Sequence, residues 1–260
     1  MKVGRPRVLV VGETCKDVFI YGECKRICPE APVPVFNPLR TVENDGMAAN
    51  VVLNLAALGV HTAFKTNEGK CPTKVRYVDS ASDQMLLRVD RDDAVAPIDD
   101  PERIVKTIQS SHFDAVVVSD YNKGLLTAEA IEAIGSAHPV TFLDTKKLIG
   151  PWCLRSFTYV KVNRVECDAA ERAGILSDEG RENLIVTDGF KGTWYRGKLF
   201  PTAAVEVRDV SGAGDTFLAA LVASYVKHKA IRKAIAFANE CAGHVVARRG
   251  VSSSLETFRV

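Results

Sequence analysis

The sequence lacks the residue patterns that build zinc sites and disulfide frameworks. Its seven cysteines form no CxxC pair, and its five histidines show no spacing typical of metal ligands. An odd number of scattered cysteines also argues against a disulfide scaffold. We therefore expect reduced thiols and a cytoplasmic location.

Long hydrophobic runs and a strong charge of one sign are absent as well. The apolar run behind the basic N-terminus is only Val8–Val11, too short for a signal peptide or a transmembrane helix. A net charge of +2 gives no reason to expect nucleic acid or an anionic membrane as a partner.

The sequence does contain a regular alternation of short β-branched runs and longer helical patterns. This alternation predicts one α/β domain over residues 1–260, in which a mostly parallel sheet carries helices on both faces. The predicted strands of this sheet are Val8–Val11, His61–Lys65, Ala115–Val118, Val140–Leu143, Tyr159–Val162 and Leu184–Val186. The predicted helices are 46–58, Pro101–Ser111, Thr127–Ser136, 215–227 and 230–248.

Residues 18–43 differ from the rest, because polar and apolar residues alternate around four prolines. Proline is tolerated in strands only where its missing amide is not needed, so this segment predicts exposed edge strands outside the main sheet. A small β lid and a long irregular loop both remain open. Residues 74–90, which are interrupted by a turn, are a second candidate for lid strands.

Polar residues repeatedly follow a buried strand of the predicted sheet. They are Asp120, Asp144, Asn163 and Thr187. Ligands of open α/β sheets bind at the carboxyl ends of the strands, so we expect these side chains to line one cleft.

The strongest local pattern is the octapeptide 209–216, which runs from Asp209 to Thr216 directly into an apolar helix. Gly212, Ala213 and Gly214 allow a tight turn whose amides face one point, and the helix dipole adds positive potential there. Asp215 at that point is either a helix cap or a base beside a bound phosphoryl group. The residues alone leave both interpretations open.

This octapeptide resembles the C-terminal signature of the ribokinase-like (PfkB) sugar kinases, in which the last aspartate is the catalytic base. The resemblance implies a three-layer αβα sandwich with a small β lid, and phosphoryl transfer from ATP to a sugar hydroxyl. It assigns Asp215 as the base and residues 212–215 as the anion hole.

Two further segments resemble the sugar-binding half of the family. Val10 to Glu13 followed by Asp17 looks like the first strand and its sugar-binding carboxylate, and residues 45–50 look like the N-terminal signature with Gly46 and Asn50. Met47 replaces the second glycine of that signature, so the pocket is reshaped or the side chain points away. A surface turn for Asp17 and a solvated Asn50 are the alternatives.

The nucleotide side is represented by three motifs. Asn163 and Glu166 match an Asn-x-x-Glu motif that organises Mg²⁺ and the ATP phosphates through water. Thr187, Gly189 and Gly192 match a Thr-x-Gly-x-x-Gly nucleotide loop, and Asn239 resembles a position near the adenine ring. The rival P-loop spacing at 192–199 ends in leucine where Mg²⁺ needs a hydroxyl, and predicts a hairpin instead.

Within the family, residues 26–35 and 119–124 most resemble the heptose 7-phosphate kinases, the kinase half of enzymes that make ADP-heptose for lipopolysaccharide. Lys123, Lys146 and Arg88 are candidates for the phosphate end of such a sugar. A homodimer through the lid strands is also implied. The chain lacks about one strand-helix unit near residues 69–72, so a kinase for another sugar or a nucleoside, and a non-catalytic binding protein of the same fold, remain alternatives.

Overall fold

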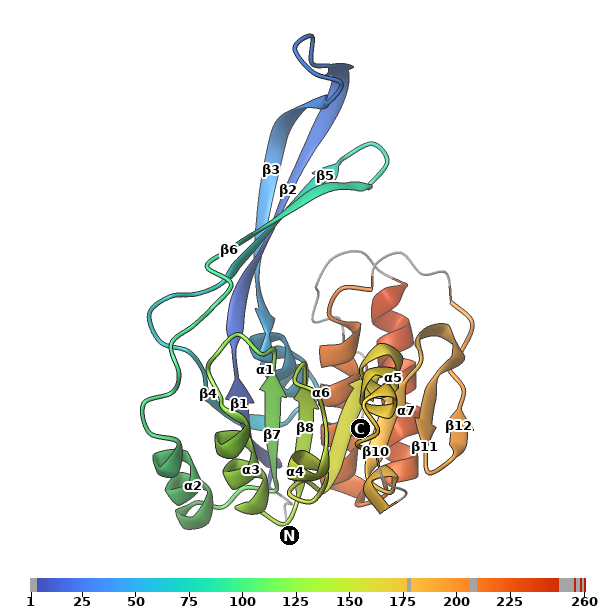
Figure 1. Ribbon diagram of the computed structural model, residues 1–260. Helices are drawn as coiled ribbons and strands as arrows, with labels where there is room; N and C mark the ends of the chain where they lie inside the picture. The colour runs from blue at the N-terminus through green and yellow to red at the C-terminus, as the bar shows by residue number, and fades with distance from the viewer. Residues whose placement is uncertain (1–3, 177–178, 206–209, 248–254, 256–257, 259) are drawn as a thin grey trace.

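The computed structural model describes residues 4–176, 179–205, 210–247, 255, 258 and 260 (Figure 1). Most of the described strands form an eight-stranded sheet in the order β12-β11-β10-β9-β8-β7-β1-β4. From β10 to β4 the neighbours pair in parallel, while β11 and β12 form an antiparallel hairpin at one edge. The bounds are β1 (Arg7–Gly12), β4 (His61–Lys65), β7 (Ala115–Asp120), β8 (Thr141–Thr145), β9 (Tyr159–Asn163), β10 (Leu184–Thr187), β11 (Thr193–Tyr195) and β12 (Lys198–Phe200).

The central strand β1 shows why helices cover both faces of this sheet. Val8 and Val10 pack into one hydrophobic core, and Leu9 and Val11 pack into another, because successive strand residues point to opposite faces. The first core is closed by α1 (Ala48–Ala57), α6 (Ala213–His228) and α7 (Ile231–Val246). The second is closed by α2 (Pro101–Ser110), α3 (Ala128–Ser136), α4 (Pro151–Leu154) and α5 (Arg164–Arg172). Two short 3₁₀ helices, Glu179–Arg181 and Gly189–Lys191, lie between α5 and β11 in the sequence.

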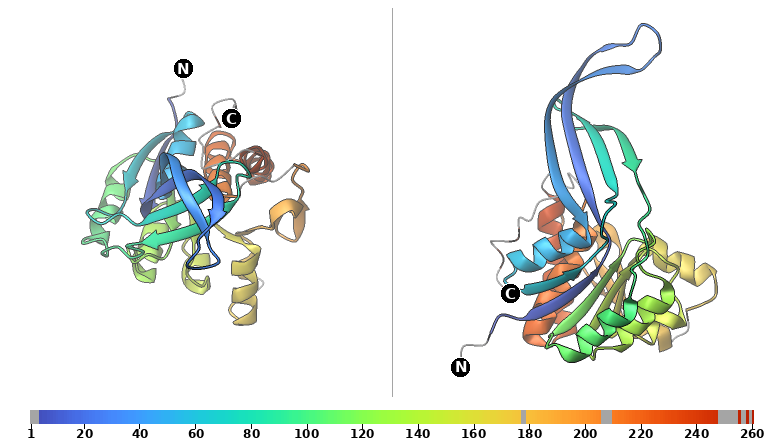
Figure 2. Two further views of the ribbon diagram at one scale, coloured as in Figure 1. Left: turned by 90° about the horizontal axis from the view of Figure 1, so that it is seen from above. Right: turned by 90° about the vertical axis from the view of Figure 1, so that its left-hand side faces the viewer.

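A second sheet of four strands stands away from this sandwich (Figures 1 and 2). Its order is β3-β2-β5-β6, with bounds β2 (Thr14–Ile27), β3 (Pro34–Met47), β5 (Thr73–Asp79) and β6 (Met85–Arg91). The strands expected in residues 18–43 and 74–90 are therefore present, and the alternative of a long irregular loop is wrong. Both long strands continue past the predicted segment to the base of the second sheet, where β3 runs into α1.

The main sheet ends at β4. The sequence predicts that a strand-helix unit of the family is absent after this strand. Residues 66–72 contain neither helix nor strand and lead directly into β5 of the second sheet. Among the described residues, no helix combines the length and apolar character needed to cross a bilayer. The hairpin expected around Arg196 and Gly197 is present, with both residues at positive φ, as a two-residue β turn requires.

Candidate functional site

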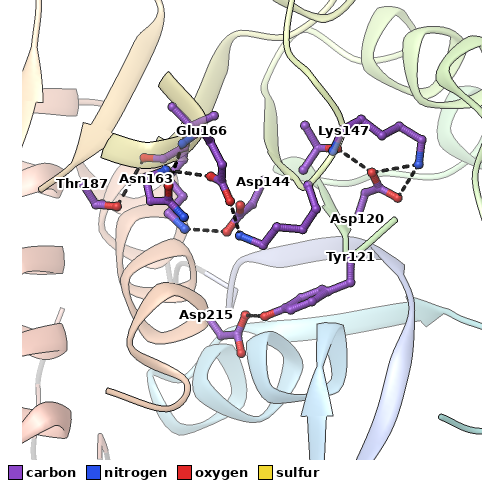
Figure 3. A network of polar contacts seen from close by, with 12 residues as sticks. Asp120, Tyr121, Asp144, Lys147, Asn163, Glu166, Thr187 and Asp215 are labelled. Carbon is purple, nitrogen blue, oxygen red and sulfur yellow. Dashed lines mark hydrogen bonds and ion pairs between the residues drawn. The ribbon is translucent and has the colours of Figure 1, made fainter. Parts of the chain in front are cut away.

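The four polar residues that follow buried strands lie along one edge of the main sheet (Figure 3). Asp120, Asp144, Asn163 and Thr187 end or nearly end β7, β8, β9 and β10, which are parallel neighbours. Parallel strands carry their carboxyl ends to the same edge, so the sequence places these side chains together for a simple topological reason.

Helix α6 begins at this edge without a side-chain cap. Its N-cap is Gly212, at φ 76° and ψ 0°, a left-handed conformation that favours glycine. Ala213 and Gly214 form the first turn, so their end of the helix offers backbone amides and the positive end of the dipole to a ligand. Asp209, the first residue of the octapeptide, lies outside the described residues.

Asp215 is the third residue of α6 and is only 5% exposed. Its Oδ2 accepts a hydrogen bond of 3.0 Å from Asn50 Nδ2, and its Oδ1 accepts one of 2.5 Å from the Tyr121 hydroxyl (Figure 3). The cap of this helix is Gly212, so the interpretation of Asp215 as a helix cap is wrong. Burial raises the pKa of Asp215 to about 6, although both hydrogen bonds act in the opposite direction.

A buried ion pair lies beside the start of α6. Lys161 of β9 and Asp144 of β8 are 4% and 6% exposed, and Lys161 Nζ lies 2.6 Å from Asp144 Oδ2. A Cβ atom on Gly214 would lie 3.1 Å from the same Nζ, so the ammonium group touches the turn that opens the helix. Lysine in the middle of a buried strand is unusual, and this one brings a positive charge to the expected anion site.

The residues expected to bind sugar meet at the base of the second sheet. Asp17 is 5% exposed on β2, and Arg76 Nη1 of β5 lies 2.5 Å from its Oδ1. Gly46 on β3 leaves the space for this carboxylate, because a Cβ there would lie 2.2 Å from Asp17 Oδ2. The alternative of Asp17 as a surface turn residue is therefore wrong.

Asn50 is buried in the first turn of α1, and the alternative of a solvated side chain is wrong. Asn54, one turn later, donates to Asn50 Oδ1 over 3.1 Å and so turns the amide of Asn50 toward Asp215. Met47 is buried as the N-cap of α1 at φ 58° and ψ −133°. This backbone conformation is one that glycine adopts readily, and it is strained for a side chain of this size.

A cavity of about 390 Å³ connects the predicted nucleotide residues with the start of α6. Thr187, Gly189, Gly192 and Asn239 line it together with Gly214. Gly192 has φ 109°, and a Cβ there would lie 2.1 Å from the Phe200 carbonyl oxygen, so only glycine fits. Asn239 Nδ2 donates to the same carbonyl over 2.8 Å, which fixes α7 against the hairpin.

Asn163 and Glu166 meet at the start of α5, where they form a capping box. The Glu166 amide donates to Asn163 Oδ1 over 2.9 Å, and the Asn163 amide donates to Glu166 Oε2 over 2.8 Å. Glu166 Oε1 also lies 2.5 Å from Lys146 Nζ. Nearby, Asp144 Oδ1 is buried without a hydrogen-bond partner. These hard oxygen donors fit Mg²⁺, which takes few protein ligands and keeps several waters.

All three cations considered for a sugar phosphate pair with carboxylates. Lys123 pairs with Asp93, Arg88 with Asp90, and Lys146 with Glu166. Sequence reasoning missed two cations on β5, Arg76 beside Asp17 and Lys74, whose Nζ lies 5.4 Å from the centre of the Tyr121 ring. In the sequence, both cations alternate with apolar residues along a single strand. This pattern by itself does not distinguish a ligand-binding face of the strand from a face that only contacts solvent.

Sequence reasoning also missed the roles of Glu13 and Tyr121. Glu13 is fully buried and accepts hydrogen bonds from the amides of Tyr121, Lys123 and Leu125. It thereby fixes the loop that carries the Tyr121 hydroxyl to Asp215. The position of Glu13 directly after a buried strand could have indicated a functional carboxylate. Its hydrogen-bond partners could not be predicted, because they lie more than 100 residues away in the sequence.

The family model of the pfkB family carbohydrate kinases matches residues 42–258. The bifunctional protein HldE of Nitratiruptor sp. is 31% identical over 300 residues, covering 96% of this chain and 63% of its own length. HldE of Vibrio vulnificus is 33% identical over 295 residues, covering 95% and 61%. The chain thus spans less than two thirds of the length of these curated relatives. The aligned stretches also exceed its 260 residues, so the relatives carry insertions relative to it.

Solved structures give the same fold at lower identity. Ribokinase of Thermotoga maritima has a TM-score of 0.72 at 18% identity, with 95% of each chain covered. Arabidopsis thaliana ribokinase, solved with ribose and ATP, has a TM-score of 0.66 at 18% identity, covering 98% of this chain and all of its own. The ribokinase-like sandwich expected from the sequence is confirmed. By its match over most of its length, the chain belongs to the pfkB family of carbohydrate kinases.

Proposed function

We propose that this protein transfers the terminal phosphoryl group of ATP to a hydroxyl of a sugar phosphate, with Asp215 as the base. The observation that carries this proposal is the position of Asp215, a buried carboxylate directly behind an uncapped helix start. The nucleotide-sized cavity reaches the same helix start at Gly214. Phosphoryl transfer needs a charge cradle and a positioned base together, and this arrangement supplies both.

ATP would lie along the cavity, with its base between Asn239 and the turn at Gly189 and its phosphates toward Gly212–Gly214. The sugar would lie over Asp17, Gly46 and Asn50. In the transfer step the sugar oxygen forms a bond to the γ-phosphorus, the bond to the β-phosphate oxygen breaks, and Asp215 takes the hydroxyl proton. The amides of Gly212 and Gly214 and the nearby Lys161 ammonium would stabilise the charge on the transferring group, whereas the Ala213 amide donates to the Val210 carbonyl oxygen.

Asn163 and Glu166 would hold Mg²⁺ through water on the phosphate side of the site. When bound, this ion supplies charge neutralisation of the β- and γ-phosphates. Lys146 is ion-paired with Glu166, and Lys161 is ion-paired with Asp144. Two ammonium groups therefore lie on the phosphate side of the proposed site.

The acceptor that we favour is a heptose 7-phosphate, on the strength of the resemblance of residues 26–35 and 119–124 and of the HldE relatives. Arg76, Lys74 and Lys146 form a basic surround near Asp17 and Tyr121 that suits an anionic sugar. The second sheet would act as the lid over this sugar. Its long strands β2 and β3 expose Ile27 and Leu39, which suits pairing with the lid of a second copy in a cytoplasmic homodimer.

Coupled ADP release over a panel of sugars, sugar phosphates and nucleosides tests this function. We expect sugar-dependent ADP release, with the highest kcat/KM for heptose 7-phosphate. Release with a hexose or nucleoside instead would reassign the acceptor. Thermal stabilisation by ATP and sugar phosphate without ADP release would identify a non-catalytic binding protein and refute the proposal.

The pH dependence of kcat/KM follows from the raised pKa of Asp215 in the ligand-free protein. The base works only in its ionised form, and burial raises its pKa to about 6. We expect kcat/KM for the sugar to be constant near neutral pH and to fall about tenfold per pH unit well below pH 6. Initial rates between pH 4.5 and 8, at sugar concentrations well below KM, measure this profile. A rate independent of pH across this range would contradict Asp215 as the base.

A further inference from the structure

The hydroxyl of Tyr121 occupies a chemically specific position in the site. It donates a hydrogen bond to Asp215 Oδ1 (Figure 3), while the Asn50 amide donates to Oδ2. Each oxygen of the proposed base therefore already accepts one hydrogen bond in the ligand-free protein. The Asn50 donor is an amide and does not resemble the attacking group. The Tyr121 hydroxyl, in contrast, donates a hydrogen bond to the carboxylate as a sugar hydroxyl would.

The surroundings keep this hydroxyl in its donor form and hold its ring in place. Burial and the charge of Asp215 hold the pKa of Tyr121 well above its usual range, so the phenol stays protonated at every working pH. The ring lies between two ammonium groups, with Lys74 Nζ of β5 at 5.4 Å and Lys146 Nζ at 5.9 Å from its centre. Lys74 belongs to the second sheet, so the proposed lid and the tyrosine touch.

The backbone of Tyr121 is anchored by the carboxylate of Glu13. The Tyr121 amide donates to Glu13 Oε2 over 2.8 Å, and the Lys123 amide donates to Glu13 Oε1 over 3.0 Å. A buried carboxylate with backbone donors of this kind is a firm support. Rotation of the Tyr121 side chain therefore releases Asp215 without disturbing the loop.

We propose that the Tyr121 hydroxyl holds the place of the acceptor hydroxyl on Asp215 in the sugar-free protein and thereby keeps water from being phosphorylated. This inference rests on the proposed function. The sugar hydroxyl displaces the tyrosine from Oδ1, and Lys74, whose Nζ lies 5.4 Å from the ring centre, then faces the anionic end of the sugar, while Lys146 stays paired with Glu166. Tyr121 is thus a positioning residue that selects sugar over water.

The reaction that Tyr121 suppresses is hydrolysis of ATP at the same base. A water at the place of the phenol oxygen would donate to Asp215, attack the γ-phosphorus and release ADP and inorganic phosphate, leaving its proton on the carboxylate. The hydrogen bond from Tyr121 to Oδ1 takes the position from which such a water would donate, and this contact is what would hold hydrolysis back.

The test compares Tyr121→Phe with the parent and with Tyr195→Phe, which removes a hydroxyl from a buried ring on β11 that lies beside the ring of Tyr159. ATP hydrolysis is measured without sugar, and the affinity for heptose 7-phosphate is measured by calorimetry. We expect sugar-free hydrolysis to rise about tenfold or more in Tyr121→Phe only, since a hydrogen bond to a charged group is lost. The sugar should bind at least as tightly as to the parent, because nothing must be displaced.

Unchanged hydrolysis in Tyr121→Phe would overturn the inference, whether or not sugar binding becomes weaker. In the sugar-free protein, removal of the donor also raises the pKa of Asp215, so the acidic limb of the kcat/KM profile for the sugar should move to higher pH, while Asp144, which raises this pKa, and Lys161, which lowers it, are unchanged. A merely structural role would lower the melting temperature and leave that limb in place. Parent protein that phosphorylates sugar while Tyr121→Phe fails to hydrolyse ATP faster would refute the inference and leave the proposed function intact.

A second measurement on the parent protein does not depend on the variant folding well. With ¹³C-labelled tyrosine, the ring carbon bonded to the Tyr121 hydroxyl reports the loss of its hydrogen bond. We expect this signal to move when heptose 7-phosphate is added at saturation, and a signal that stays in place despite measured sugar binding would overturn the inference. Assignment comes from its disappearance in Tyr121→Phe.

Discussion

Replacing Asp215 with Asn is expected to lower kcat by about 10²- to 10⁴-fold, the usual contribution of a positioned general base. The amide keeps the shape of the side chain, so it still fits between Asn50 and Tyr121 at the start of α6. It can no longer accept the proton of the attacking hydroxyl. ATP binding should change little, because the nucleotide cavity is lined by Thr187, Gly192 and Asn239 rather than by this carboxylate.

Steady-state ADP release and ATP titration calorimetry measure the two quantities separately. Asp168→Asn is the matched control, since it neutralises a partly exposed carboxylate of α5 whose described ion pair is with Arg164 on the surface. The control should keep parental kcat. If Asp215→Asn turned over at the parental rate, Asp215 would not be the base, and a loss of ATP affinity equal to the loss of rate would point to a binding role instead.

The main sheet was predictable because its strands are short runs of β-branched residues that need no knowledge of distant segments. Ala115–Val118 and Leu184–Val186 are buried on both faces, so their composition alone indicates parallel strands under helices. The capping box at Asn163 and Glu166 has a local sequence signature, yet it was interpreted only as a nucleotide motif. The helix α5 that it starts was missed for that reason.

The site was predictable only where its chemistry lies within a short motif. Gly212 to Asp215 are adjacent in sequence, and their turn conformation follows from glycine. In contrast, the bond from Tyr121 to Asp215 joins residues 94 positions apart, and the pair of Arg76 with Asp17 depends on how β5 pairs with β2. Such contacts follow from strand order, which no local pattern contains.

The buried pair of Lys161 and Asp144 leads to the second large prediction, on stability. Lys161→Met keeps the length and apolar stem of the side chain but leaves the Asp144 carboxylate buried without its cation. Asp144 Oδ1 already lacks a hydrogen-bond partner, so Oδ2 would lose its bond to Nζ as well. We expect the free energy of unfolding at pH 7 to fall by about 3–5 kcal/mol, the usual cost of breaking a buried ion pair from one side.

The double variant Lys161→Met with Asp144→Asn separates the cost of an unpaired charge from the loss of packing. Because the amide is neutral and has nearly the shape of the carboxylate, the double variant should be more stable than Lys161→Met alone, which is a strongly favourable coupling in a double-mutant cycle. Urea unfolding of the parent, both single variants and the double variant measures this coupling. Additive losses would show that the two side chains act independently and that the ammonium group at Gly214 is not held there by Asp144. In that case the positive charge at the start of α6 would need another support, and the electrostatic share that we assign to Lys161 in phosphoryl transfer would lose its structural basis.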